Sequence, residues 1–292
     1  MTDRNSPDGL WLACGDMERV AADFLIEVLS PFAEPMRLCY EAGIQAPTLP
    51  GTRHNSEDLR IAALFLKKTL GDLRAVWLLT CMGYTSQAAS VAASLYENAL
   101  AVTSFAGDEA AAKKFSSSRL GDLPWGAKEL AQRLGARWSS AAVTEGRSFT
   151  GAEREIAWRN VYSQYKWLCK IKHPTLPSAL HDAGATAVTT PEFVVMAAPD
   201  LRPEDTPVKA TVVFIALVRT LEAVRFFGRE ISPDKSHSTY IEFRHRVENA
   251  STLMADAYKN SQIGPLPFDL RDSSLMREIL DIRTRASGRS TS

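Results

Sequence analysis

One face of the helix predicted over residues 151–173 combines positive charge, a phenol and an imidazole. At 100° per residue, an arc of about 80° holds Glu155, Arg159, Tyr162, Lys166, Lys170 and His173. We call this arc the His173 stripe. The opposite side carries Val161, Leu168 and Ile171, so we expect those side chains to be buried and the stripe to be accessible. From Arg147 to His173 six bases stand against two acids, an excess that suits a phosphate or an RNA backbone.

The most reactive member of the stripe is His173, which precedes a proline and is therefore predicted to end the helix. A helix C-terminus favours a protonated imidazole, and this ring can take and give a proton near neutral pH. If RNA is the substrate, we assign catalytic roles to His173 and Lys166. The residues assigned to binding are Arg159, Tyr162 and Lys170. Ordinary solvation of an amphipathic helix, with C-capping by the histidine, is the alternative.

A second polar group, Tyr96-Glu97-Asn98, lies in the middle of an alanine-rich helix predicted over residues 85–106. A carboxylate among buried residues needs a partner. The predicted partner is an arginine of another helix, namely Arg60, Arg74, Arg219 or Arg225. The functional alternatives are a catalytic carboxylate, or a small-molecule pocket that Tyr96 and Glu97 line beneath residues 174–206.

Caps, first-turn prolines and closing glycines divide the chain into about seven main helices, which predicts an all-α bundle. The main helices are expected over 7–29, 30–43, 56–83, 85–106, 150–173, 206–228 and 236–260, with shorter ones over 108–117, 124–135 and 272–282. The core should form around 59–82, 85–105 and 208–227. Residues 174–206 lack a helical period, which predicts a long irregular insertion with a short hairpin near 187–196.

Residues 7–260 are predicted to form a single helical domain, followed by a partly disordered C-terminal extension over 261–292. A division into two domains near 107–148 is the alternative. The first eight residues do not resemble a secretory signal. The longest apolar run, 210–218, is nine residues long, whereas a bilayer needs about 20. We therefore expect a cytoplasmic protein without a membrane span.

The composition excludes several function classes. With 34 basic and 34 acidic residues the formal net charge is zero, so a polyanion site must be local. The cysteines are far apart and predict no disulfide; they are Cys14, Cys39, Cys81 and Cys169. The histidines form no metal-binding spacing, and the glycine-rich nucleotide loops and the serine-hydrolase elbow are missing, so we expect neither metal nor cofactor.

Two stretches of the chain resemble a bacterial family of helical proteins of unknown function. They are residues 83–115, with Ser94-Leu95-Tyr96-Glu97-Asn98, and residues 162–174, which end in Lys170-Ile171-Lys172-His173-Pro174. Members of that family often carry an arginine one turn before the glutamate, where this chain has Ala92-Ala93. A role that needs this arginine is therefore not expected here.

The helix that ends at His173 also resembles the HEPN superfamily, whose members include metal-independent RNases of toxin and phage-defence systems. Their motif is an arginine, four to six residues, then a histidine; here six residues separate Lys166 from His173. The resemblance implies a helical protein of bacterial defence that binds RNA or cleaves it without metal, and such proteins often act as dimers. A non-enzymatic module that binds itself or a partner protein, and a small-molecule sensor, remain alternatives.

Overall fold

The computed structural model describes residues 7–51, 53, 56–118, 121–144, 146–186, 198–232 and 234–261. Within these residues the regular elements are all helices, which confirms the all-α prediction for this part of the chain. They are α1 (Pro7–Val28), η1 (Ser30–Phe32), α2 (Ala33–Gln45), η2 (Ala46–Thr48), α3 (Glu57–Cys81), α4 (Thr85–Phe105), α5 (Glu109–Ser116), α6 (Ala127–Thr144), α7 (Gly151–Lys172), α8 (Leu176–Ala183), η3 (Gly184–Thr186), η4 (Pro203–Asp205), α9 (Thr206–Ile231) and α10 (Ser238–Ser261), where η marks a 3-10 helix.

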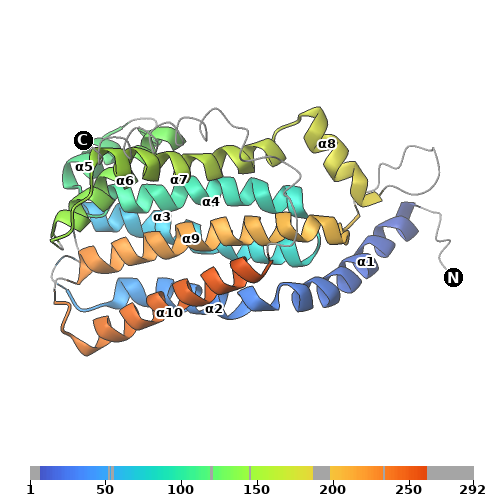
Figure 1. The fold of residues 1–292 in the computed structure, drawn as a ribbon, viewed down its shortest axis with the longest axis horizontal. Helices are drawn as coiled ribbons and strands as arrows, with labels where there is room; N and C mark the ends of the chain where they lie inside the picture. Colours follow the sequence, from blue (N-terminus) through green and yellow to red (C-terminus); the bar gives the residue numbers. More distant parts are fainter. Residues whose placement is uncertain are drawn as a thin grey trace, which may run out of the picture.

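The long helices α3, α4, α7 and α9 lie side by side along the long axis of the molecule (Figure 1). Helices α2 and α10 pack together on one side of them, and α5 and α6 lie at one end of the bundle. Helix α8 lies at the other end, towards which α1 also extends. The core therefore lies between α3, α4 and α9, as the apolar periodicity predicts.

Helix α4 is central because it carries little side-chain bulk. It packs against α3, α6, α7 and α9. Its buried alanines are Ala88, Ala89, Ala92, Ala93, Ala99 and Ala101. Small side chains let neighbouring helix axes approach closely, which explains how one helix can contact so many others.

Helix α7 begins and ends where its sequence predicts. Thr150 and Glu153 form a reciprocal capping box, in which the Thr150 amide donates to Glu153 at 2.6 Å. Pro174 follows the C-cap residue His173, whose backbone is extended. The aliphatic side faces the core, since Val161, Leu168 and Ile171 are buried.

Two boundary predictions are wrong. Helix α6 continues for nine residues beyond Gly135, its predicted end. A Cβ atom on this glycine would lie 3.1 Å from Cβ of Trp158, so the glycine serves the close approach of α6 and α7 and does not end the helix. The predicted irregular insertion contains α8, which Thr175 caps with its hydroxyl. The hairpin predicted near 187–196 lies outside the described residues.

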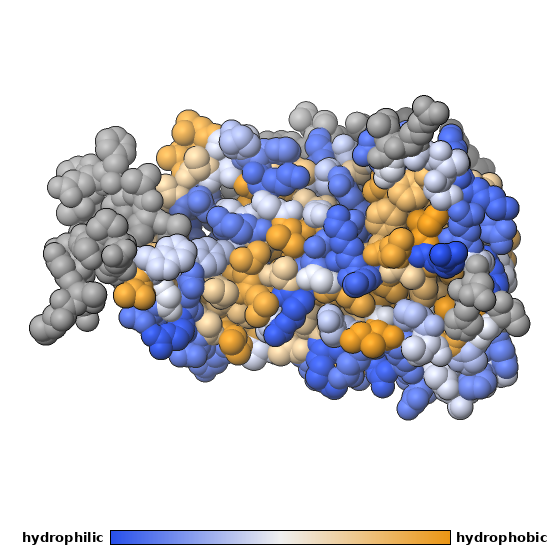
Figure 2. Space-filling view, turned by 180° about the vertical axis from the view of Figure 1, so that it is seen from behind, coloured by the Kyte–Doolittle hydropathy of each residue, from blue (hydrophilic) through white to orange (hydrophobic). Residues whose placement is uncertain are grey.

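Exposed apolar side chains are unevenly distributed over the molecule. On the face in Figure 2, hydrophobic surface occurs in patches between hydrophilic side chains. Helix α1 exposes an unusual number of large apolar residues, namely Trp11, Leu12, Val20, Phe24 and Ile26. All four cysteines are free thiols. Among the described residues, no helix combines the length and apolar character that a bilayer span requires.

Candidate functional site

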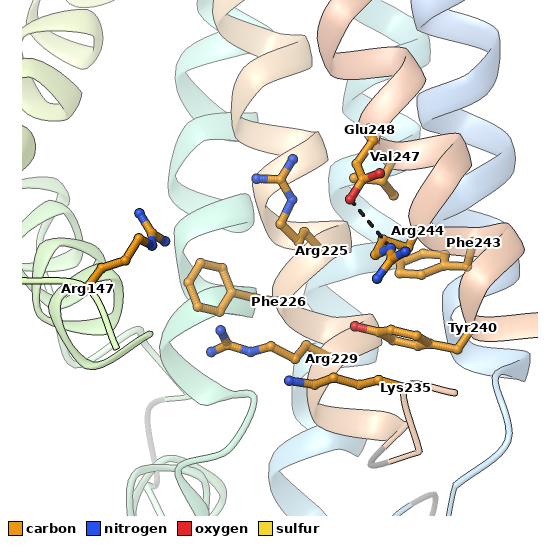
Figure 3. Close-up of a pocket in the computed structure, with 10 residues that line it drawn as sticks. All are labelled: Arg147, Arg225, Phe226, Arg229, Lys235, Tyr240, Phe243, Arg244, Val247 and Glu248. Atoms are coloured by element: carbon orange, nitrogen blue, oxygen red, sulfur yellow. Dashed lines mark ion pairs between the residues drawn. The ribbon is translucent and has the colours of Figure 1, made fainter. Parts of the chain in front are cut away.

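Three connected hollows open where α6 and the end of α9 meet the start of α10. We call them together the basic groove. The first, of 470 Å³, lies between Arg147, α9 and α10 (Figure 3). The second, of 370 Å³, shares Arg229 and Lys235 with the first, and the third, of 190 Å³, shares Arg137 and Ser140 with the second. The charged lining residues are Arg133, Arg137, Arg147, Arg225, Arg229, Lys235 and Arg244, with Asp108, Glu230 and Glu248.

The third hollow of the groove lies at the C-terminal end of α4. Arg133 and Arg137 lie one turn apart on α6. Both donate to main-chain carbonyl groups at the C-terminal end of α4. The Arg137 Nη2 to Ala106 O distance is 2.7 Å, and Arg133 Nη2 lies 3.4 Å from Ser104 O. The final carbonyls of a helix have no partner within it and carry partial negative charge, so arginines stabilise them. The same contacts hold both guanidinium groups at the groove.

One carboxylate keeps several of these cations together. Glu230 lies 3.0 Å from Arg137, 3.5 Å from Arg53 and 3.7 Å from Arg229, measured between nitrogen and oxygen. Gly107, with φ +85°, lets the turn after α4 approach this cluster, because a Cβ atom there would lie 2.8 Å from Glu230 Oε2. A side chain at position 107 would therefore disturb both the turn and the ion pairs.

Aromatic rings also support the arginines. The Phe226 ring centroid lies 5.3 Å from Cζ of Arg137 and 4.9 Å from Cζ of Arg229, within the range of cation–π attraction. Phe226, Tyr240 and Phe243 line the first hollow but are themselves buried. The rings therefore act as an apolar floor under the charges, and their faces are not open for stacking by a nucleobase.

The groove keeps an excess of positive charge. Seven basic side chains face three acidic ones, whereas the whole chain is neutral. Burial lowers the pKa of Arg137 below its ordinary value; Glu230 acts against this, and the positive charges of Arg229 and Arg133 reinforce it. An anion bound in the groove would offset both the burial and the repulsion.

The His173 stripe is only partly accessible. Lys166, Lys170 and His173 are exposed. The expectation that Arg159 is also accessible is wrong, because its side chain is 17% exposed, is paired with Glu155 and lies 4.4 Å from the Trp158 ring. Helix α7 has 22 residues and is about 33 Å long at 1.5 Å per residue, so His173 lies far from the groove end of the bundle.

Glu97 has a different partner from the arginine that was expected. Tyr165 donates to Glu97 Oε1 at 2.7 Å. The Tyr165 ring lies 5.0 Å from that of Tyr96 and 6.3 Å from that of Tyr162, between centroids. The structure thus joins the predicted binding residues Tyr96, Glu97 and Tyr162 through Tyr165, a residue that the sequence analysis missed. Tyr96 itself is fully buried.

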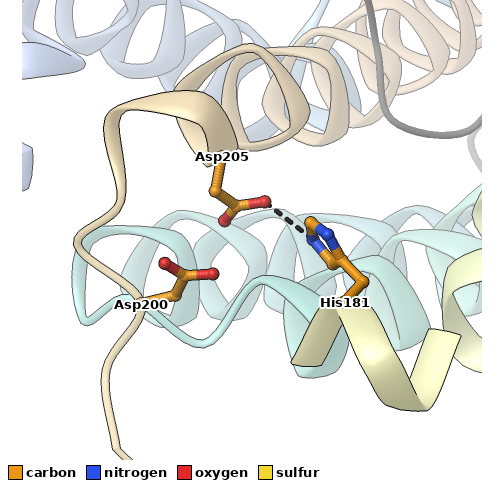
Figure 4. Close-up of side chains that lie close together, drawn as sticks. All are labelled: His181, Asp200 and Asp205. Carbon is orange, nitrogen blue, oxygen red and sulfur yellow. Dashed lines mark hydrogen bonds and ion pairs between the residues drawn. The ribbon is translucent and has the colours of Figure 1, made fainter. Parts of the chain in front are cut away.

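A buried polar cluster was also missed. His181, Asp200 and Asp205 bring a ring nitrogen and two carboxylate oxygens within 4.8 Å of one another (Figure 4). The His181 Nε2 to Asp205 Oδ1 distance is 2.9 Å. These residues come from α8 and from the segment that leads into α9. Because they are far apart in the sequence, no motif spacing predicts the cluster. Their geometry resembles a set of metal ligands.

The charges of this cluster are already balanced without a metal. The fully buried Lys209 donates to Asp205, and so does Thr85 of α4, at 2.5 Å from oxygen to oxygen. Arg202 pairs with Asp200 at 2.5 Å. A divalent cation would add two charges to carboxylates that already have cationic partners, so the donor set does not favour it. The cluster instead ties α8 to α4 and α9.

Comparison with protein-family models, curated proteins and solved structures found no match to this chain. The resemblance to the HEPN superfamily therefore stays a prediction.

We predict that Lys209→Met destabilises the fold by about 3–5 kcal/mol at pH 7, because it leaves Asp205 buried without its cation. Urea unfolding measures this change, and Lys170→Met, at an exposed position of α7, should change stability by less than about 0.5 kcal/mol.

The loss should shrink in acid. Burial alone would raise the pKa of Asp205, but the His181 hydrogen bond and the Lys209 charge offset it, and the pKa lies below its ordinary value. The wild-type contribution is therefore present above about pH 4, the unfolded pKa, and disappears as the pH falls through the folded one. An equal loss at pH 7 and at about pH 3 would contradict this account.

Proposed function

We propose that the protein binds RNA and that the sugar–phosphate backbone lies in the basic groove. The observation that carries this proposal is the local excess of seven basic over three acidic side chains in a chain without net charge. Phosphate contacts supply most of the affinity of proteins that bind nucleic acids without sequence preference. The resemblance to RNA-acting helical proteins favours RNA over DNA.

The shape of the groove favours a strand over a single small molecule. The first hollow, at 470 Å³, would hold a small ligand by itself. The second hollow shares Arg229 with it, and the third hollow shares Arg137 with the second, so successive phosphates can each meet a guanidinium. Because the aromatic rings of the floor are buried, recognition of the backbone is favoured over recognition of the bases.

We predict that Arg225→Gln combined with Arg244→Gln weakens RNA binding at least about tenfold at low salt and reduces the salt slope by about one per lost phosphate contact. Both side chains line the first hollow, and neither holds Glu230. Fluorescence anisotropy with single- and double-stranded RNA, between about 50 and 200 mM salt, measures the effect.

The matched control is Lys166→Gln combined with Lys170→Gln, which removes the same charge from the His173 stripe. It should leave affinity nearly unchanged, because these lysines lie on α7 outside the groove. Equal losses in the two double variants would mean that general charge attraction is responsible and that the groove is not the site.

RNA cleavage would need catalytic residues in addition to the groove, and His173 and Lys166 are the candidate catalytic residues. If the wild-type protein cuts RNA in the presence of a chelator, we expect His173→Ala to abolish cutting while binding persists, because the imidazole is the stripe's candidate for general acid–base catalysis. Gel analysis of labelled RNA measures this. Cutting that survives in His173→Ala would remove the catalytic role of the histidine.

A second candidate function is self-association through α1. This helix packs along α3 and η1 and leaves five large apolar side chains exposed. Val20 is 62% exposed and Phe24, one turn later, is 46% exposed. Large apolar side chains that are exposed on one helix mark interaction sites, and a second copy of the chain is a partner that is always present.

We expect the wild-type protein to form a dimer in light scattering over a concentration series, and Val20→Ser combined with Phe24→Ser to be a monomer. The control is Val143→Ser on α6, which changes a residue that is 67% exposed and should leave the mass unchanged. A wild-type protein that stays monomeric at every concentration would contradict self-association.

A further inference from the structure

The third hollow of the basic groove differs from the other two in size and in position. Its volume is 190 Å³, the smallest of the three, and it is the last of the series on the side of α4 and α6. It is several times the roughly 30 Å³ that one water occupies, which is enough for one tetrahedral oxyanion. Its polar lining residues are Ser104, Asp108, Arg133, Arg137 and Ser140.

Three buried polar atoms of this lining have no hydrogen-bond partner among the described residues. They are Ser104 Oγ, Arg133 Nε and Arg137 Nε. The Ser104 side chain belongs to a residue that is only 2% exposed. Buried polar groups nearly always find partners in folded proteins, so three unsatisfied donors around one hollow require an explanation.

Other polar groups of the lining are engaged within the protein. Arg133 Nη2 donates to Asp108 Oδ2 at 2.8 Å, and Asp108 Oδ1 accepts from the Ala111 amide at 3.0 Å. The Trp125 ring lies 4.0 Å from Cζ of Arg133 and fixes its guanidinium plane. Arg137 uses Nη2 for Ala106 O and Glu230. Both guanidinium groups are thus held by their outer nitrogens, while each Nε keeps an unused N–H.

We propose that Ser104, Arg133 and Arg137 bind the terminal phosphate of the RNA that lies in the basic groove. The proposal rests on RNA binding by that groove. A terminal phosphate has three free oxygens and a charge of about −1.5 to −2, and the residues that line the hollow have three unused donors. An internal phosphodiester has only two free oxygens and one charge. The hollow lies at an end of the series, where a strand would present its own end.

The test compares one RNA sequence in three forms: with a 5′-phosphate, with a 3′-phosphate, and with hydroxyls at both ends. Fluorescence anisotropy should show one of the phosphorylated forms binding about tenfold more tightly than the hydroxyl form, the size expected for one or two charge-assisted hydrogen bonds. Either end supports the proposal, and the preferred end gives the direction of the strand.

Variants connect that preference to the hollow. Ser104→Ala should reduce it several-fold and leave the fold intact, because the Ser104 hydroxyl makes no hydrogen bond within the described structure. Arg133→Gln should remove most of it. The control Ser90→Ala, on the same helix, replaces a hydroxyl that donates to its own helix at Ser86 O and should preserve the preference.

The two proposals fail in different ways. If all three RNAs bind the wild-type protein equally well, the terminal-phosphate site is overturned while RNA binding stands. If no RNA binds at low salt, RNA binding itself is overturned, and the terminal-phosphate site with it. A preference that survives both Ser104→Ala and Arg133→Gln would place the terminal phosphate elsewhere in the groove and would also overturn the assignment.

Discussion

The small side chains of α4 are the constraint on which the rest of the structure depends. Alanines in the middle of this helix let α3, α7 and α9 approach it closely, and α6 packs against it as well. The middle of α6 and the end of α9 thereby meet beside Gly107, directly after α4. The arginines of α6 find unpaired carbonyl groups there, so the packing of the core determines where positive charge can be held.

The two basic regions of the chain show that local charge and a binding site are different properties. The His173 stripe has the higher density of charge in the sequence, but it lies on the outer face of a single helix and loses Arg159 to Glu155 and Trp158. In the groove, the cations come from several helices and surround hollows. Converging donors can contact one ligand together, whereas the two exposed lysines of the stripe lie on the surface of a single helix.

Signals that act within one helix were readable from the sequence. The capping box at Thr150 and the proline after His173 defined α7, and its apolar period identified the buried side, because caps and periodicity are local physics. The groove was not readable, since α6, α9, α10 and the segment at Arg147 each contribute ordinary arginines. The sequence did contain one signal of the groove: α6 and α9 each carry two arginines that are four residues apart, and these lie on one face of their helix. The partner of Glu97 was missed because it depends on how α4 and α7 pack.

The guanidinium groups that crowd around Glu230 favour anion binding but lower the stability of the unliganded fold. Like charges held a few ångströms apart raise the energy of the folded protein, and this repulsion is lowest when an anion is bound. A substitution that removes an arginine from the rim could therefore strengthen the empty fold while weakening its affinity for a ligand. Selection for thermal stability alone would tend to remove these arginines. Their retention would therefore be evidence that the groove binds an anion.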